Sequence, residues 1–127
     1  MDPTLDNTIS LLARTPTSLN ALLRDLPDSW TSQNEGPSTW TPFEVIAHLI
    51  HAERTDWMPR VKMILELGES QAFPPFDREG NSRESQSQTL PHVLDEFSNL
   101  RSANLTALRS LNLRPQDLAR RGRHPAF

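Results

Sequence analysis

Histidines offer the clearest chemistry in this 127-residue sequence, and there are four of them: His48, His51, His92 and His124. His48 and His51 are three residues apart in a segment with helical periodicity, so both side chains can lean to one side of one helix. Two imidazoles so placed can share a divalent metal if other ligands complete the set. The spacing alone leaves His48 either as a ligand or as a satisfied histidine at the edge of the core. It leaves His51 either as a second ligand or as a partly exposed surface residue.

Carboxylates stand on both sides of this histidine pair. Glu44 lies one turn before His48, where it could orient the imidazole or complete a capping box; we favour the capping box. Glu53 and Asp56 follow on the same segment. They are interpreted either as a general base or extra ligand, or as solvated carboxylates paired with neighbouring arginines. The sequence has no Ser-His-Asp order, glycine-rich phosphate loop or HExxH motif.

Composition narrows the classes of function. The absence of cysteine excludes disulfides, thiolate nucleophiles and zinc–thiolate sites. The first residues do not resemble a signal peptide and no apolar run is long enough to cross a bilayer, so we expect a cytoplasmic protein that does not bind membranes. We also expect no nucleic-acid partner, because the net charge is −3 and the basic C-terminal stretch lacks interleaved aromatic residues. That stretch contains Arg109, Arg114, Arg120, Arg121 and Arg123.

Hydrophobic periodicity predicts the elements that position these residues. Apolar side chains recur at helical spacing over residues 4–26, 41–68 and 89–111, and no segment alternates as a strand would. The class is therefore all-α. Thr15-Pro16 predicts a kink or a junction between two abutting helices in the first segment, and Pro59 predicts a bend in the second.

Residues 69–88 have no period, and a loop of this length in a small domain is either functional or a connector. Phe73 and Phe76 would pin such a connector to the helices. Both interpretations stay open at this point.

Three segments resemble the DinB-like (DinB/YfiT) superfamily: WTPFEVIAHL at 40–49, FPPFD at 73–77 and GRHPAF at 122–127. Glu53 and Arg60 also fall where that pattern has them. The resemblance implies a single DinB-like helical domain over residues 1–127, an up-and-down bundle with a metal at one end. Within it, His48 matches the first metal ligand.

The family's other two ligands are histidines on a final helix that follows the GRHPAF turn. No residue here matches them, so the resemblance implies three of four main helices and a domain incomplete at its C-terminus, or a site that has been lost. An incomplete bundle should leave an apolar groove, covered by a partner subunit, by a further segment of the chain or by a changed arrangement.

The function that the resemblance implies is a metal-dependent enzyme, a transferase using a low-molecular-weight thiol or a hydrolase, on an unknown substrate. The divalent metal would be nickel, zinc, iron or manganese, and the protein would be a homodimer. A single histidine binds such a metal weakly, so the alternative is a metal-free helical module that associates through its apolar groove.

Overall fold

The computed structural model describes residues 4–80 and 87–126, and this part of the chain is helical, as predicted. The helices are α1 (Leu5–Leu23), α2 (Asp28–Thr31), α3 (Pro42–Thr55), α4 (Trp57–Leu67), α6 (Leu90–Ser110) and α7 (Pro115–Leu118). Among the described residues, the only strand-like pairing is a single parallel bridge between Ala72 and Arg123. No helix in these ranges is long and apolar enough to cross a membrane.

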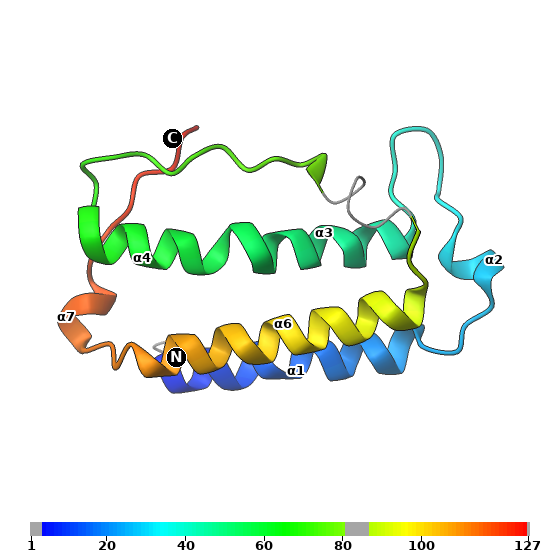
Figure 1. The fold of residues 1–127 in the computed structure, drawn as a ribbon, viewed down its shortest axis with the longest axis horizontal. Coiled ribbons are helices and arrows are strands. Elements are labelled where there is room, and N and C mark those ends of the chain that lie inside the picture. The colour runs from blue at the N-terminus through cyan, green and yellow to red at the C-terminus, as the bar shows by residue number, and fades with distance from the viewer. Residues whose placement is uncertain (1–3, 81–86, 127) are drawn as a thin grey trace.

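The long helices lie side by side, with α3 and α4 forming one nearly continuous rod (Figure 1). α1 runs in one direction and α3–α4 in the other, and both α1 and α3 pack against α6 (Figure 1). The segment after α4 then passes back along the outer side of this rod, so that α6 runs in the same direction as α3–α4 rather than opposite to it (Figure 1). The residues after α7 lie beside that returning segment.

The core lies where α1, α3 and α6 face one another. Its buried side chains come from all three helices: Leu23, Ile46, Ile50, Val93, Leu94 and Phe97. Burial of these side chains is the main source of stability for helices that would be marginal alone.

Prolines act differently in the two places where the sequence predicts a bend. Pro59 has no N–H and cannot donate to the carbonyl of Thr55, so the helix breaks one turn before the proline, at Asp56 between α3 and α4. Pro16, by contrast, lies inside an uninterrupted α1, so of the two alternatives predicted there, a kink or two abutting helices, the second is excluded.

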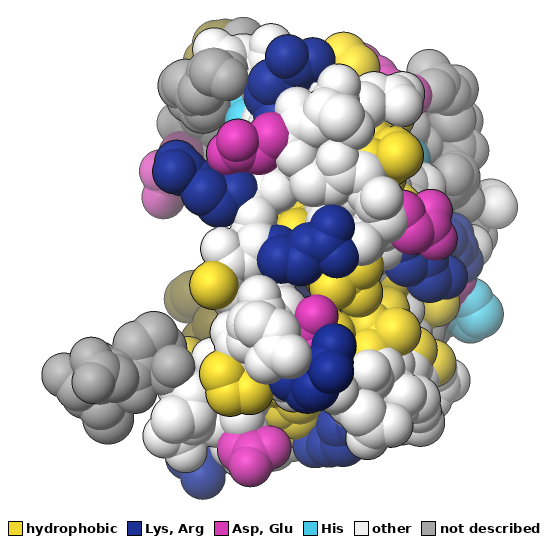
Figure 2. All heavy atoms as spheres, turned by 90° about the vertical axis from the view of Figure 1, so that its left-hand side faces the viewer, with side chains coloured by type: hydrophobic (Ala, Val, Ile, Leu, Met, Phe, Trp, Pro, Cys, Tyr) yellow, Lys and Arg dark blue, Asp and Glu magenta, His cyan; other side chains and the backbone are white. Residues whose placement is uncertain are grey.

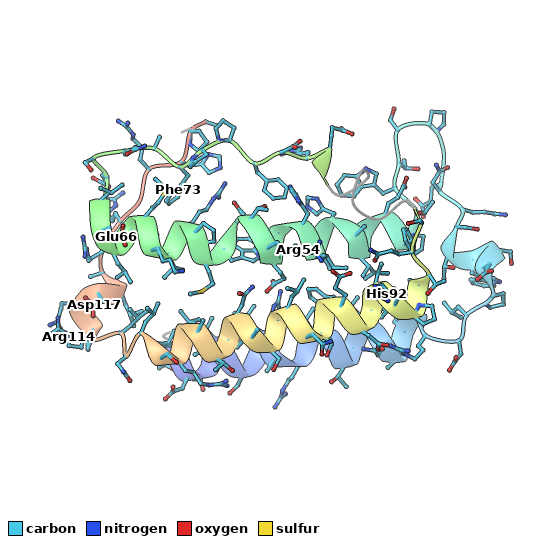
Figure 3. All side chains as sticks on the ribbon, viewed as in Figure 1. Arg54, Glu66, Phe73, His92, Arg114 and Asp117 are labelled. Atoms are coloured by element: carbon cyan, nitrogen blue, oxygen red, sulfur yellow. The ribbon has the colours of Figure 1, made fainter. Side chains whose placement is uncertain are left out.

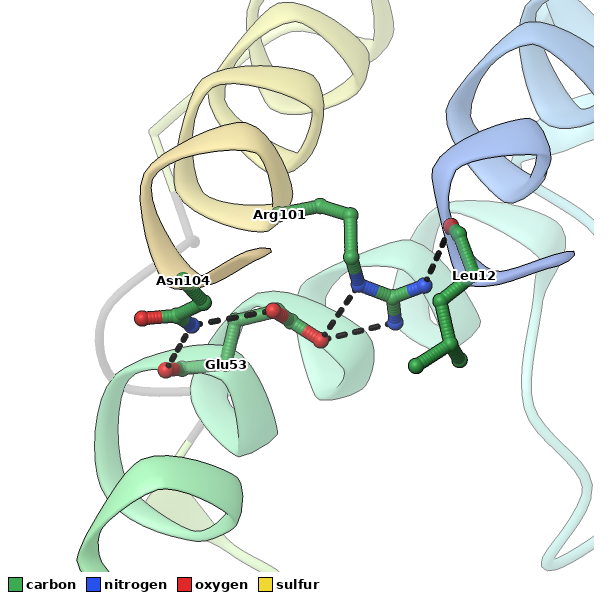
Figure 4. A network of polar contacts seen from close by, with 4 residues as sticks. All are labelled: Leu12, Glu53, Arg101 and Asn104. Carbon is green, nitrogen blue, oxygen red and sulfur yellow. Dashed lines mark hydrogen bonds and ion pairs between the residues drawn. The ribbon is translucent and has the colours of Figure 1, made fainter. Parts of the chain in front are cut away.

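The carbonyl of Leu12, which Pro16 leaves without its helical donor, is satisfied from another helix (Figure 4). Arg101 of α6 donates to this carbonyl at 2.9 Å, and to Oε1 of Glu53 at 2.9 and 2.7 Å. Asn104 donates to the backbone carbonyl of Glu53 at 2.8 Å and to its Oε2 at 3.0 Å. Glu53 and Arg101 are only 4% and 9% exposed, so this ion pair joins α1, α3 and α6 inside the bundle.

A candidate metal centre on α3

The capping box at the start of α3 fixes the register of the helix that carries the histidines. The Thr41 hydroxyl accepts the backbone N–H of Glu44 at 3.1 Å, and the Glu44 carboxylate accepts the N–H of Thr41 at 2.7 Å. Glu44 therefore caps the helix, as we favoured from the sequence.

His48 lies one turn further along α3, between two aromatic rings. The Trp40 ring is 4.7 Å from the imidazole, centroid to centroid, and the Phe76 ring meets it edge-on at 5.3 Å. Its Nδ1 is buried and has no hydrogen-bond partner among the described residues. A histidine satisfied within the core would have such a partner, since buried polar atoms are nearly always bonded.

Burial lowers the pKa of His48 below its usual 6.5. The neighbouring His51 and Arg78 lower the pKa further, and Asp56 opposes them. This lowering favours the neutral form of the imidazole, which is the form that binds metal ions.

His51 is more buried than a surface residue would be, at 6% exposure, so the surface interpretation of His51 is wrong. Its ring lies 5.1 Å from the ring of Phe76, which thus contacts both histidines. Gly80 packs directly on the imidazole: a Cβ at this position would lie 2.4 Å from Cε1 of His51. The loop after α4 therefore closes over the helix face that carries the pair.

Phe73 anchors this loop to α4. Its side chain is buried next to Arg60, whose guanidinium lies 5.0 Å from the ring centroid. Its backbone N–H donates to the carbonyl of Arg123 at 2.9 Å. Gly122 lies against the same ring, where a Cβ would come within 2.4 Å of Cζ. Two phenylalanines thus pin this part of the loop, as predicted, and residues 81–86 lie outside the described part.

A cavity of about 210 Å³ opens between the loop and the break between α3 and α4. It is lined by His51, Thr55, Asp56, Pro59, Arg60, Pro74, Pro75, Phe76 and Asp77. The Asp56 carboxylate pairs with Nε of Arg60 at 2.7 Å. A small molecule could therefore reach the helix face that carries the histidine pair.

The structure separates the other candidates from this site. The Glu53 carboxylate is held by Arg101, so it is neither solvated nor paired with the arginines next to it in sequence. His92 is exposed at the start of α6, 3.9 Å from Glu96, and His124 accepts the N–H of Ala126 at 3.1 Å.

The C-terminal arginines make separate local contacts. At α7, the backbone N–H of Arg114 donates to the Asp117 carboxylate at 2.9 Å, and the two side chains form an ion pair (Figure 3). Arg121 pairs with Glu69 at 3.3 Å. Arg120 donates to the carbonyl of Leu65 near the end of α4.

The described residues supply only part of a metal site. No three His, Cys, Asp or Glu side chains within residues 4–80 and 87–126 are grouped closely enough to hold an ion. The buried Nδ1 of His48 fits a ligand role, but an imidazole alone does not make a divalent site.

The described residues thus form a helical bundle in which the buried Nδ1 of His48 lacks a partner, and His48 contacts Phe76 in the wall of a cavity. The comparisons make this more specific. A family model described as the DinB superfamily matches residues 11–127, and the chain therefore belongs to the DinB superfamily.

Among solved structures, the chain resembles YfiT from Bacillus subtilis, described as a probable metal-dependent hydrolase with an unusual four-helix bundle topology. The TM-score is 0.75 at 24% identity, and the match covers 99% of this chain and 75% of that one. At this identity the likeness shows a common fold. No curated protein matches the sequence.

Proposed function

We propose that this chain supplies His48 as a ligand to a divalent metal in an enzyme of the hydrolase type, or in a transferase that uses a low-molecular-weight thiol. The observation that carries the proposal is the buried Nδ1 of His48, which has no hydrogen-bond partner among the described residues. Leaving a buried nitrogen unsatisfied costs about 1–3 kcal/mol, and a metal ion or its bound water would remove that cost. The solved structure that shares this fold is described as a probable metal-dependent hydrolase, which supports the same proposal.

The ion, whether nickel, zinc, iron or manganese, would act as a Lewis acid that lowers the pKa of a bound water or thiol. The chain's own residues prepare the position for it. The lowered pKa favours the neutral form of the His48 imidazole, and the Trp40 and Phe76 rings pack against it. The cavity beside His51 would receive the organic substrate.

A complete site needs further ligands, and we propose that they come from a second subunit or from polypeptide outside the described residues. Metal analysis after purification, with nickel, zinc, iron and manganese offered in turn, tests the proposal. We expect bound metal in the wild type and its loss in His48→Ala, while His92→Ala, which removes an exposed histidine from α6, keeps it. Wild type and His48→Ala with equally little metal would refute the ligand role.

A second candidate is a homodimer formed through an apolar groove, and it requires no metal. A groove of about 330 Å³ runs between α1, α4 and α6, and Trp57 on its edge is 52% exposed. Its lining is Leu12, Glu53, Trp57, Met58, Val61, Arg101, Asn104, Leu105 and Leu108. At the end of the bundle where α4 ends and α7 lies, hydrophobic side chains gather between Lys and Arg side chains (Figure 2).

Light scattering tests the dimer. We expect a mass twice that of the chain, shifted to the monomer in Trp57→Lys. Trp30→Lys is the matched control, because Trp30 is also exposed, at 70%, but lies on α2 away from the groove. A wild-type monomer at every concentration would contradict this second candidate.

A further inference from the structure

The cavity beside the histidine pair contains a guanidinium whose hydrogen-bonding capacity is largely unused. Arg60 begins the second turn of α4, where the break before Pro59 turns its side chain toward the loop. Its Nε lies 2.7 Å from the Asp56 carboxylate, and its plane lies over Phe73. The side chain is 20% exposed, so most of it has been taken out of water.

A guanidinium has five N–H groups and stays charged at any physiological pH. The buried Nε of Arg60 lies 2.7 Å from Oδ1 of Asp56, an ion pair that lacks the geometry of a hydrogen bond. The two terminal nitrogens make no hydrogen bond or ion pair with a described residue. The terminal nitrogens are not buried, so their N–H groups are open to a ligand, and a planar pair of them matches the two oxygens of a carboxylate.

We propose that this cavity binds the carboxylate of a small, largely apolar organic acid, with the terminal nitrogens of Arg60 as its anchor. The remaining walls suit the apolar part of such a molecule, since they are formed by three prolines and a phenyl ring: Pro59, Pro74, Pro75 and Phe76. Phe76 also contacts His48 and His51, so a bound acid would lie next to the proposed metal ligand. That the organic acid is a substrate rests on the proposed function, whereas the binding of the acid to the cavity does not.

Two carboxylates also line the cavity, and they make a protonated amine the competing ligand. Asp56 already faces the guanidinium. Asp77 accepts the backbone N–H of Glu79 at 3.1 Å through Oδ1. Each carboxylate therefore already has a partner, whereas the terminal nitrogens of Arg60 have no acceptor among the described residues, and this difference favours an anion at those nitrogens.

Three probes of one size separate the possibilities: benzoate, benzyl alcohol and benzylammonium, titrated into metal-free protein and followed by NMR shifts of the protein amides and the His51 ring. We expect benzoate to bind at least tenfold more tightly than the other two. Arg60→Lys keeps the charge but loses the planar fork, so it should weaken benzoate roughly tenfold or more. Arg54→Lys, on the same rod but facing Glu96 of α6, should leave binding unchanged.

Asp77→Asn provides an independent test that leaves the anchor intact. It should tighten benzoate severalfold, because a negative charge is removed from the cavity. Tightest binding of benzylammonium, or benzoate affinity that Arg60→Lys leaves unchanged, would overturn the proposal; so would the absence of shifts up to the solubility limit of benzoate. The titrations use metal-free protein, so a failure to bind benzoate leaves the metal proposal standing. A failure of the metal analysis likewise leaves the proposal of carboxylate binding standing.

Discussion

The buried ion pair between Glu53 and Arg101 allows a quantitative test of the account of the fold. Arg101→Met removes the guanidinium while keeping much of its apolar volume. Three contacts disappear, two to Oε1 of Glu53 and one to the Leu12 carbonyl, and the carboxylate keeps only the donor from Asn104. Breaking a buried pair in this way costs about 3–5 kcal/mol, because a charge is left uncompensated.

The double variant separates that cost from the net value of the pair. Glu53→Leu together with Arg101→Met removes both charges. We expect the free energy of unfolding of the double variant to fall by about 1–3 kcal/mol less than the sum of the decreases in the two single variants. Urea unfolding followed by circular dichroism measures all four free energies of unfolding.

Arg54→Met is the matched control. Arg54 pairs with Glu96 across the same two helices, but its side chain is 38% exposed, so its loss should cost no more than about 1 kcal/mol. Equal effects of Arg54→Met and Arg101→Met, or strict additivity in the double variant, would refute the reasoning.

Three further predictions concern the loop, the cap and the pH dependence. Gly122→Ala should lower the free energy of unfolding by about 1–3 kcal/mol, since the added Cβ meets Phe73, and urea unfolding would show it. Thr41→Ala removes half of the capping box with Glu44, so thermal unfolding should show a loss of about 0.5–2 kcal/mol. The folded pKa of His48 lies below its unfolded value near 6.5, so wild-type stability should be full above that pH and decline as pH falls toward the folded pKa. His48→Gln should flatten this decline in unfolding experiments at a series of pH values, and a parallel pH profile would count against it.

Local sequence signals predicted the elements well. The capping box at Thr41 and the apolar periodicity placed the main helices close to their observed bounds, because both signals act within a few residues. The effect of Pro16 was not predictable from local sequence alone. Its orphaned acceptor, the Leu12 carbonyl, is satisfied by Arg101, which lies 89 residues away in the chain.

The candidate site also combines features that the local sequence predicts with features that arise only from contacts between distant residues. The sequence places His48 and His51 on one helix, but the burial of His51 comes from Gly80 on the returning loop, which no spacing rule connects to it. Arg60 carried only a weak signal, as a member of the family pattern. Its place in a cavity follows from the helix break at Asp56 and from the packing of Phe73 on its guanidinium. Both features are located only by the three-dimensional structure.

The central claim is that His48 binds a metal, and the imidazole NMR signals of the four histidines test it most directly. Zinc would be titrated into the protein while each ring is followed separately. The account predicts that the His48 ring shifts at lower zinc concentration than the exposed His92 ring, and that this shift at low zinc is absent from His48→Gln. Simultaneous shifts of all the histidines, or a His92 ring that shifts at lower zinc concentration than the His48 ring, would contradict the account.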